Sequence, residues 1–128
     1  MQSIHQRLHP VYIVDDDEAV RSGFSRLLRS AGLEPRPFGS STQFLEEVRT
    51  IHGACILLDI TMPGMTGLEV QEQLAARHID LPVIAVSAHD DDATRMLAHR
   101  AGACLFLRKP VDDQALLDAI SWVTRSSA

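Results

Sequence analysis

Four short runs of apolar residues recur along the chain, and each one ends next to a polar or charged residue. The runs cover residues 11–14, 54–58, 82–86 and 104–107. Because they are almost continuous rather than alternating, they predict strands that are buried on both faces of a sheet. A weaker fifth strand is predicted over residues 34–38, where Pro35 and Pro37 favour an edge position because missing N–H groups matter least there.

Segments with helical spacing of apolar residues follow the predicted strands. The residues that mark these five helices are, in chain order, Val20, Phe24, Leu27, Leu28 and Ala31; Phe44, Leu45 and Val48; Leu68, Gln71, Leu74 and Ala75; Met96, Leu97 and Ala101; and Leu116, Ile120 and Val123. We expect Met96, Leu97 and Ala101 to form the inner face of the fourth helix. Gly32 and Gly102 are expected to end the first and fourth helices. Hydroxyl or carboxylate groups suited to helix starts occur at Ser40–Thr42, Asp90–Asp92 and Asp112.

Strand and helix patterns thus alternate five times. Such alternation is typical of α/β proteins, in which helices cover both faces of a parallel sheet. A length of 128 residues suits one domain. We expect residues 1–9 to form a loosely ordered N-terminal tail and residues 10–124 to form the domain. Residues 125–128 would be a C-terminal tail or the start of a linker.

Composition and charge narrow the classes of function. The chain is 45% hydrophobic and carries a formal net charge of −5, with its Arg residues scattered rather than clustered. A surface that binds duplex nucleic acid normally needs clustered Lys and Arg, so direct nucleic-acid binding is not expected. No apolar run is long enough to span a bilayer, and the N-terminal segment lacks the apolar core of a signal peptide. These features favour a cytoplasmic protein with no membrane contact.

The polar residues at the strand ends form the candidate site. In an open parallel sheet, ligands bind outside the carboxyl ends of the strands. The residues found at these ends are Asp15, Asp16, Asp17, Asp59, Ser87 and Lys109. Several carboxylates, one hydroxyl and one amine are therefore expected at the same edge of the sheet.

Carboxylates that are brought together in a partly buried crevice repel one another. A hard divalent cation removes that repulsion, and Mg²⁺ prefers oxygen ligands. Helix capping is the favoured interpretation of Asp17, and it remains an alternative for Asp15 and Asp16 taken alone. Capping does not explain Asp59, because that carboxylate ends a central buried strand.

Lys109 is the only lysine, since eleven of the twelve Lys and Arg residues are Arg. An ammonium is a compact point charge whereas a guanidinium is a planar fork, so a site that places a small cation near a phosphoryl oxygen would select lysine. The hydroxyl of Ser87 could donate to the same oxygen or could bond to local backbone. The chain has no Gly-rich phosphate loop, so metal, lysine and hydroxyl would have to hold a phosphoryl group.

Four motifs together resemble the receiver domain of two-component response regulators. They are Val14–Asp17, Leu58–Gly67, Pro82–Ala88 and Phe106–Pro110. Each is a modest signal alone, but all four in this order at strand ends are very specific, and the resemblance spans about residues 10–124. Residues 11–28 and 81–90 look most like the FixJ-type branch, whose members usually carry a C-terminal DNA-binding helix-turn-helix.

The resemblance implies a flavodoxin-like (βα)5 fold, with a doubly wound parallel sheet in the strand order 2-1-3-4-5. It implies that Asp59 is the phospho-acceptor and that Mg²⁺ is the cofactor. The metal ligands would be Asp15, Asp16, Asp59 and the backbone carbonyl of Thr61. Asp16 would be the more direct ligand, and Asp15 would act partly through water.

The remaining site roles are also implied by the resemblance. Lys109 would pair with the phosphoryl group, Ser87 would swing toward it, and Phe106 would follow into the vacated space. Ser87 and Phe106 would thus form the switch, while Thr61 and His89 would modulate the lifetime of the acyl phosphate. Ser87 stands where Thr is commoner, and Phe106 stands where many members have Tyr, so no phenolic OH takes part.

As such a receiver, the chain would accept a phosphoryl group from a sensor histidine kinase and change conformation. It would not be an enzyme, apart from catalysing its own phosphorylation and dephosphorylation. The phosphorylated form would make a homodimer through the fourth helix, fifth strand and fifth helix. This switch would control a transcription-regulating output domain that is not present in this chain, or the chain would act as a stand-alone receiver.

Two other classes of protein compete with this interpretation. An aspartyl-phosphate hydrolase usually presents a second acid two residues after its nucleophile, and Thr61 occupies that position here. A pseudo-receiver that acts only as a binding module would lack one of the key residues, and none is missing. Both alternatives are therefore less favoured than a phosphorylation-controlled switch.

The two cysteines, Cys55 and Cys104, lie in apolar runs, and we interpret both as small buried hydrophobic residues. In the fold that the resemblance implies, they lie on the third and fifth strands with the fourth strand between them. Two strand spacings are roughly 9–10 Å, which is beyond the reach of a disulfide. We therefore expect two free thiols, as in most cytosolic proteins.

Overall fold

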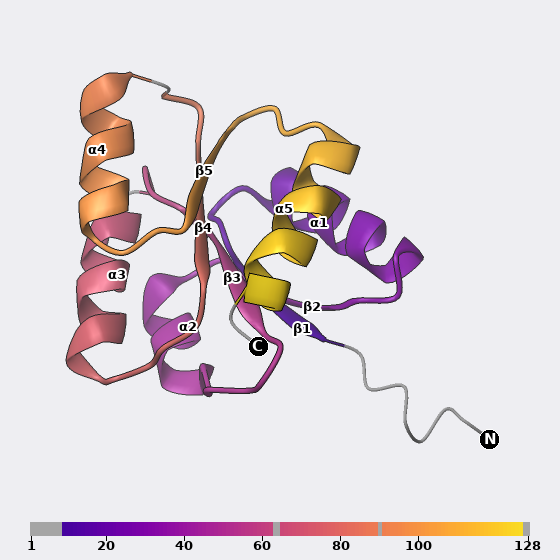
Figure 1. Cartoon of the computed structure of the whole chain (residues 1–128), viewed down its shortest axis with the longest axis horizontal. Coiled ribbons are helices and arrows are strands. Elements are labelled where there is room, and N and C mark those ends of the chain that lie inside the picture. Colours follow the sequence, from indigo (N-terminus) through magenta and orange to yellow (C-terminus); the bar gives the residue numbers. More distant parts are fainter. Residues whose placement is uncertain (1–8, 63–64, 90, 127–128) are drawn as a thin grey trace.

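Five parallel strands form a single sheet in the order β2-β1-β3-β4-β5 (Figure 1). The structure is a computed structural model, and it describes residues 9–62, 65–89 and 91–126. The strands are β1 (Pro10–Val14), β2 (Glu34–Phe38), β3 (Cys55–Asp59), β4 (Val83–Ser87) and β5 (Leu105–Arg108). All neighbouring strands pair in parallel. The predicted flavodoxin-like strand order is therefore confirmed.

The burial of each strand follows from its sequence. Every residue of β1, β3 and β4 is buried, as their continuous apolar runs predict. The strand β2, which carries Pro35 and Pro37, lies at an edge of the sheet and is only partly buried. The strands β3 and β4 each end one residue later than predicted, so that Asp59 and Ser87 are their last residues.

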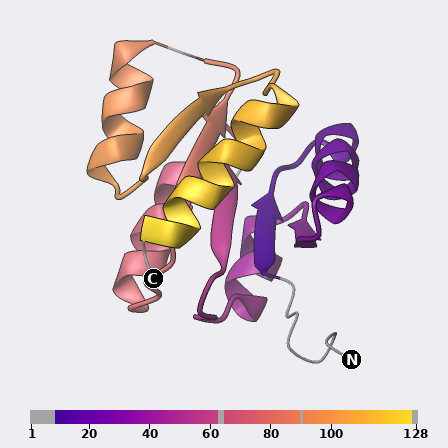
Figure 2. The same ribbon diagram turned by 45° about the vertical axis from the view of Figure 1, so that its right-hand side comes forward.

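Helices cover both faces of the sheet (Figure 2). They are α1 (Glu18–Ser30), α2 (Ser41–Glu47), α3 (Gly67–Ala76), α4 (Asp92–Arg100) and α5 (Asp113–Ser126). The helices α1 and α5 bury Leu28, Leu116 and Ile120 against one face, while α2 and α3 bury Phe44 and Val70 against the other. Alternate residues of each central strand serve these two cores, because successive side chains point to opposite faces.

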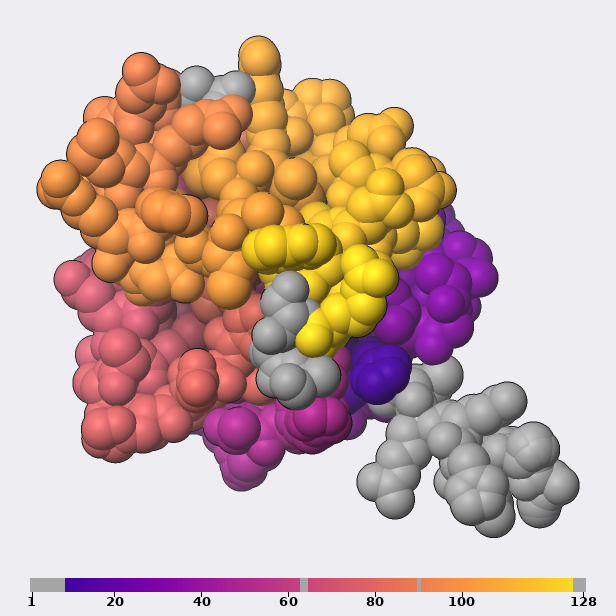
Figure 3. Space-filling model, in the orientation of Figure 1, coloured from indigo at the N-terminus to yellow at the C-terminus, as the bar shows by residue number. Residues whose placement is uncertain are grey.

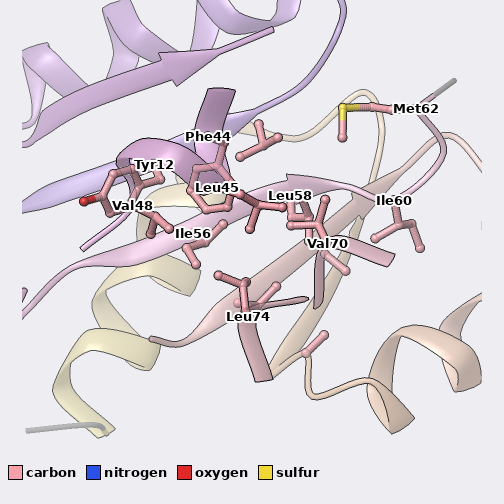
Figure 4. Packing of buried hydrophobic residues seen from close by; sticks show 14 of the residues in the cluster. Tyr12, Phe44, Leu45, Val48, Ile56, Leu58, Ile60, Met62, Val70 and Leu74 are labelled. Carbon is pink, nitrogen blue, oxygen red and sulfur yellow. The ribbon is translucent and has the colours of Figure 1, made fainter. Parts of the chain in front are cut away.

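The core beneath α2 and α3 is built around an aromatic contact (Figure 4). The rings of Tyr12 and Phe44 meet edge to face with centroids 5.5 Å apart, an arrangement that aromatic pairs prefer. Ile56 and Leu58 of β3 lie in the same core and pack with Val70. The phenolic oxygen of Tyr12 is satisfied, since it accepts a bond from a backbone N–H at 3.1 Å.

The predicted inner face of α4 is wrong for Met96 and Leu97, whereas Ala101 is partly buried as predicted. Met96 and Leu97 are 51% and 52% exposed, and Ala98 is the buried residue of this helix. The inward stripe runs through Thr94, Ala98 and Ala101, which are spaced by four and three residues as on one helical face. The helix therefore presents its two largest apolar side chains to solvent rather than to the core.

The prediction that both cysteines are buried is only half correct. Cys55 is buried in β3, whereas Cys104 is exposed and precedes the first residue of β5. Both thiols are free, as expected. Ala31 was also expected on the inner face of the first helix, but it is exposed at the helix end, where Gly32 has a φ of 81°.

The expected N-terminal tail lies outside the described residues, apart from His9, as do Pro63, Gly64 and Asp90 of the predicted site loops. The helix α5 continues to Ser126, which is inside the segment that was expected to be a tail. No helix in the described part of the chain is long and apolar enough to cross a membrane.

Candidate functional site

The carboxyl ends of three central strands bring the predicted site residues together. Asp15 follows β1 directly, Asp59 ends β3 and Ser87 ends β4; their exposed fractions are 2%, 4% and 0%. Lys109 follows β5, and its ammonium reaches the same place. The parallel sheet therefore collects at one edge groups that are far apart in the sequence.

Three carboxylates at this edge of the sheet form a compact group of oxygen ligands. Asp15, Asp16 and Asp59 offer carboxylate oxygens that all lie within 4.8 Å of one another. Asp16 is exposed, while Asp15 and Asp59 are buried. An all-oxygen set of this kind matches the preference of Mg²⁺, which binds through a few carboxylates and keeps several waters. Because Asp16 faces solvent, the retained waters would have room there.

Asp15 is held by donors on both of its carboxylate oxygens. The backbone N–H of Asp17 donates to Oδ1 at 2.9 Å, and the ammonium of Lys109 lies 2.7 Å from Oδ2. Burial raises the pKa of Asp15; the bonds from Lys109 and Asp17 oppose this effect, and the charge of Asp59 adds to it. The ionised form of this buried carboxylate is thus costly until a cation compensates it.

Lys109 bridges two carboxylates. Its ammonium lies 2.7 Å from Asp15 Oδ2 and 3.3 Å from Asp59 Oδ2. Burial alone would lower the pKa of Lys109, but the bonds to Asp15 and Asp59 and their negative charges outweigh it and raise the pKa. The lysine therefore stays charged at neutral pH and offsets part of the carboxylate repulsion.

The carboxylate of Asp59 is also fully engaged. Its Oδ1 accepts bonds from the backbone N–H and from the hydroxyl of Thr61, both at 2.9 Å. Its Oδ2 faces Lys109. The hydroxyl bond was not anticipated from the sequence, although a Thr two residues after an Asp is a spacing at which such local bonds form.

The backbone at the start of α3 closely approaches the end of β3. A Cβ atom added to Gly67 would lie 2.4 Å from the Cα atom of Ile60 and 2.6 Å from the carbonyl oxygen of Asp59. Only glycine fits at this first residue of α3. Nothing in the local sequence marks this contact, because it joins a helix start to the end of β3.

Two further predicted residues lie beside this cluster. The hydroxyl oxygen of Ser87 accepts a bond from the backbone N–H of His89 at 2.9 Å, and the residue His89 is itself exposed. Phe106 of β5 is partly buried, and the guanidinium of Arg95 in α4 lies over its ring, 5.1 Å from the centroid. This stacking joins α4 to β5 at a half-exposed position.

Asp17 has the capping role that was favoured for it. Its side chain accepts bonds from the backbone N–H groups of Ala19 and Val20 at the start of α1. Asp91 similarly caps α4 through Thr94, and this bond lowers the pKa of Asp91. These two aspartates therefore serve helix starts.

Comparison with known proteins identifies the family. The model of the response regulator receiver domain matches residues 11–121, so the chain belongs to the receiver domain family of response regulators. It is 41% identical over 119 residues to the response regulator protein TmoT of Ectopseudomonas mendocina, covering 93% of this chain and 54% of that protein. It is 39% identical over 111 residues to the transcriptional regulatory protein FixJ of Azorhizobium caulinodans, covering 87% and 53%. The chain thus spans about half the length of these relatives.

Solved structures agree with this assignment. The response regulator StyR superposes with a TM-score of 0.85 at 44% identity, covering 94% of this chain and 61% of that one. The structure named FixJ-N gives a TM-score of 0.85 at 29% identity, covering 93% and 95%. Both the receiver family and the resemblance to FixJ-type proteins are therefore confirmed.

Proposed function

We propose that Asp59 accepts a phosphoryl group from the phosphohistidine of a sensor histidine kinase and that the domain changes conformation in response. The observation that carries this proposal is the convergence of Asp15, Asp16 and Lys109 on the buried carboxylate of Asp59. The chain's membership in the receiver family supports it. By analogy with its relatives, the switch would control a transcription-regulating output domain.

The transfer reaction requires only one covalent step from the protein, the attack by Asp59. A carboxylate oxygen of Asp59 attacks the phosphorus, and a P–O bond forms as the P–N bond breaks. The imidazole of the kinase leaves with the bonding electron pair and takes a proton from solvent. Positioning and charge neutralisation dominate such loose transition states, and Lys109 lies close enough to Asp59 to neutralise a phosphoryl oxygen.

The carboxylate group fits the Mg²⁺ that the family implies. Asp15, Asp16 and Asp59 would hold the ion, and by the family resemblance the backbone carbonyl of Thr61 would be a further ligand. When bound, Mg²⁺ supplies positive charge next to the phosphoryl oxygens. The raised pKa of Asp15 is consistent with a cation site, because burial makes its ionised form costly without a compensating charge.

The switch would begin at Ser87 and Phe106. In the structure the hydroxyl of Ser87 is bound to the backbone of His89 rather than to Asp59. Phosphoryl oxygens on Asp59 would draw this hydroxyl toward them, and Phe106 would move into the space that it leaves. Because Arg95 is stacked over Phe106, this movement would also change the contact between β5 and α4. Thr61 and His89 would influence hydrolysis of the acyl phosphate.

The output surface would be formed by α4, β5 and α5, which present exposed Met96, Leu97 and Trp122 at 51%, 52% and 50% exposure. Figure 3 shows α4 and α5 on the same face of the molecule. Large apolar side chains that are exposed on the single chain are suited to an interface with a second copy. We propose that this surface joins two phosphorylated copies in a homodimer.

Phosphorylation is tested directly with acetyl phosphate and Mg²⁺. Intact-mass spectrometry should show a gain of one phosphoryl group in the wild type and none in Asp59→Asn. The matched control is Asp80→Asn, an exposed aspartate before β4 at the other end of the sheet, which should be phosphorylated normally. No gain in the wild type, or an equal gain in Asp59→Asn, would refute the proposal.

A further inference from the structure

Arg21 of α1 reaches back to the peptide that joins two of the site carboxylates. Its Nη1 donates to the backbone carbonyl oxygen of Asp15 at 2.7 Å. That carbonyl belongs to the peptide bond between Asp15 and Asp16, so the bond fixes the peptide plane from which both side chains project. The backbone N–H of Asp15 donates in turn to the carbonyl of Phe38 at 3.1 Å. Asp15 is thus held by its backbone from both sides.

Gly39 provides the space for the guanidinium. A Cβ atom at this position would lie 2.8 Å from Nη1 and 3.1 Å from Cζ of Arg21. The side chain of Arg21 therefore lies between the loop after β1 and the loop after β2, against a residue that has no side chain. Arg21 is also partly buried. Its side chain is therefore held by packing, unlike a long side chain that extends freely into solvent.

We propose that Arg21 is a positioning residue for the divalent-cation site, through the peptide that links Asp15 and Asp16. The inference rests on the proposed function, because it concerns the Mg²⁺ that the carboxylates would hold. Arg21 bonds to a neutral carbonyl and leaves the carboxylate oxygens available. Lys109 differs in this respect, because it bonds to the carboxylates themselves.

Positioning and simple electrostatics predict opposite effects for the loss of Arg21. If the guanidinium acted only through its charge, removing it would strengthen cation binding, because a nearby positive charge repels Mg²⁺. If it positions the ligands, removing it weakens binding, because the carboxylates must then be ordered by the cation itself. Groups that orient metal ligands from outside the first coordination shell typically change metal affinity by about 10- to 100-fold.

The experiment is calorimetric titration of the whole chain with MgCl2 at fixed ionic strength. Arg21→Met should raise the Kd for Mg²⁺ about tenfold or more, and Arg21→Lys should fall between this variant and the wild type. Arg26→Met removes another positive charge from the same helix at an exposed position and should leave the Kd nearly unchanged. Equal or tighter Mg²⁺ binding by Arg21→Met would overturn the proposal.

Gly39→Ala tests the same contact without changing any charge. The added methyl should displace the guanidinium from the Asp15 carbonyl and weaken Mg²⁺ binding in the same direction. In a double-mutant cycle, Arg21→Met and Gly39→Ala should be non-additive, because both remove one contact. Additive effects, or Gly39→Ala binding as the wild type does, would contradict the proposal even if Arg21→Met does not fold.

The titration separates this inference from the proposed function. A wild type that binds no Mg²⁺ would refute the metal-dependent function and the inference together. A wild type that binds Mg²⁺ and is phosphorylated on Asp59, with Arg21→Met unchanged in Kd, would refute the inference alone.

Discussion

The ammonium of Lys109 lies closer to Asp15 than to Asp59, with Nζ 2.7 Å from Asp15 Oδ2 and 3.3 Å from Asp59 Oδ2. In this arrangement the lysine serves mainly to compensate the carboxylate of Asp15, which follows β1. Binding a phosphoryl group on Asp59 would require it to shift toward the new oxygens. If Asp59 is phosphorylated as we propose, Lys109 would stabilise the unphosphorylated site and also respond to phosphorylation.

Replacement of Lys109 by Ala should separate these two roles. We expect Lys109→Ala to accept a phosphoryl group from acetyl phosphate, since Asp59 and the other carboxylates remain. The conformational response should be lost, because no ammonium follows the phosphoryl oxygens. The only tryptophan, Trp122 of α5, provides a fluorescence signal for the response, and intact mass measures phosphorylation. Arg29→Ala, an exposed cation of α1, is the control. A normal fluorescence change in phosphorylated Lys109→Ala would contradict the role.

The raised pKa of Asp15 predicts a pH dependence of stability. Since burial raises this pKa in the folded protein, the folded state holds the proton more tightly than the unfolded state does. Tighter proton binding by Asp15 in the folded state stabilises the protein. This stabilisation is complete below the unfolded pKa of about 3.9 and is lost as the pH rises through the folded pKa of Asp15. In EDTA, Asp15→Asn should therefore melt at the same temperature as the wild type near pH 3 and above it at pH 7.

Thermal melts of both proteins from pH 3 to pH 7 check this expectation. The informative quantity is the difference in Tm between Asp15→Asn and wild type, which cancels the titration of other groups. Added Mg²⁺ should stabilise the wild type and not the variant, because the variant has lost a carboxylate ligand. A lower Tm for Asp15→Asn at pH 7 in EDTA would contradict this expectation. It would show that the ion pair with Lys109 stabilises ionised Asp15 by more than burial of its charge destabilises it.

The hydroxyl of Thr61 should slow phosphorylation of Asp59. It donates to Oδ1 at 2.9 Å and withdraws electron density from the attacking carboxylate. Thr61→Val removes this bond and keeps the backbone N–H, so phosphorylation by acetyl phosphate should become faster by several-fold, about tenfold at most for one hydrogen bond. Thr61→Ser retains the hydroxyl and should behave as the wild type does. Slower phosphorylation of Thr61→Val would contradict the prediction.

The two thiols should differ sharply in reactivity. Burial raises the pKa of Cys55 to about 12, and its side chain is fully buried; Cys104 is exposed. Since the thiolate is the reactive form, a disulfide reagent at pH 8 should modify one thiol quickly in the folded protein and two after unfolding. Cys104→Ser should remove the fast reaction. Two fast thiols in the folded wild type would show that Cys55 becomes accessible.

Two glycines in helices should respond oppositely to alanine. Gly67→Ala would place a methyl against the backbone of Ile60 and Asp59, and such overpacking typically costs about 1–3 kcal/mol. Gly23 of α1 has open space around its Cβ position, so Gly23→Ala should stabilise the protein by about 0.5–1 kcal/mol. Urea unfolding of both variants measures the free energies. Equal stability of Gly67→Ala and the wild type would show that the backbone at Ile60 can move away from the added methyl.

Much of the fold was predictable because its signals are local. The apolar runs of β1, β3 and β4 are buried at every residue, and the prolines of β2 mark the edge strand. The candidate site was predictable for a related reason, since Asp59 and Ser87 directly follow apolar runs and Lys109 comes two residues after another. The carboxyl ends of parallel strands meet at one edge, so these positions converge whatever the details of packing.

The exposure of α4 and of Cys104 could not be predicted in this way. Met96 and Leu97 are apolar and suit a core, but the helix buries the small Ala98 instead. Which stripe of a helix faces the sheet depends on how closely the helix can approach, and a small residue permits a closer approach than two long ones. Cys104 lies one residue before the start of β5. An error of one residue in the predicted strand start therefore changes the expected burial of this side chain.

The sequence by itself determined the alternating elements, the buried strands and the identities of the residues at the candidate site, because these depend on the hydrophobic pattern and on position relative to it. The tertiary structure decided which atoms meet. The bond of Lys109 to Asp15, that of Arg21 to the Asp15 carbonyl and the close approach of Gly67 to Asp59 join different elements of the fold. Such contacts are set by the packing of helices against the sheet, and no local pattern in the chain encodes them.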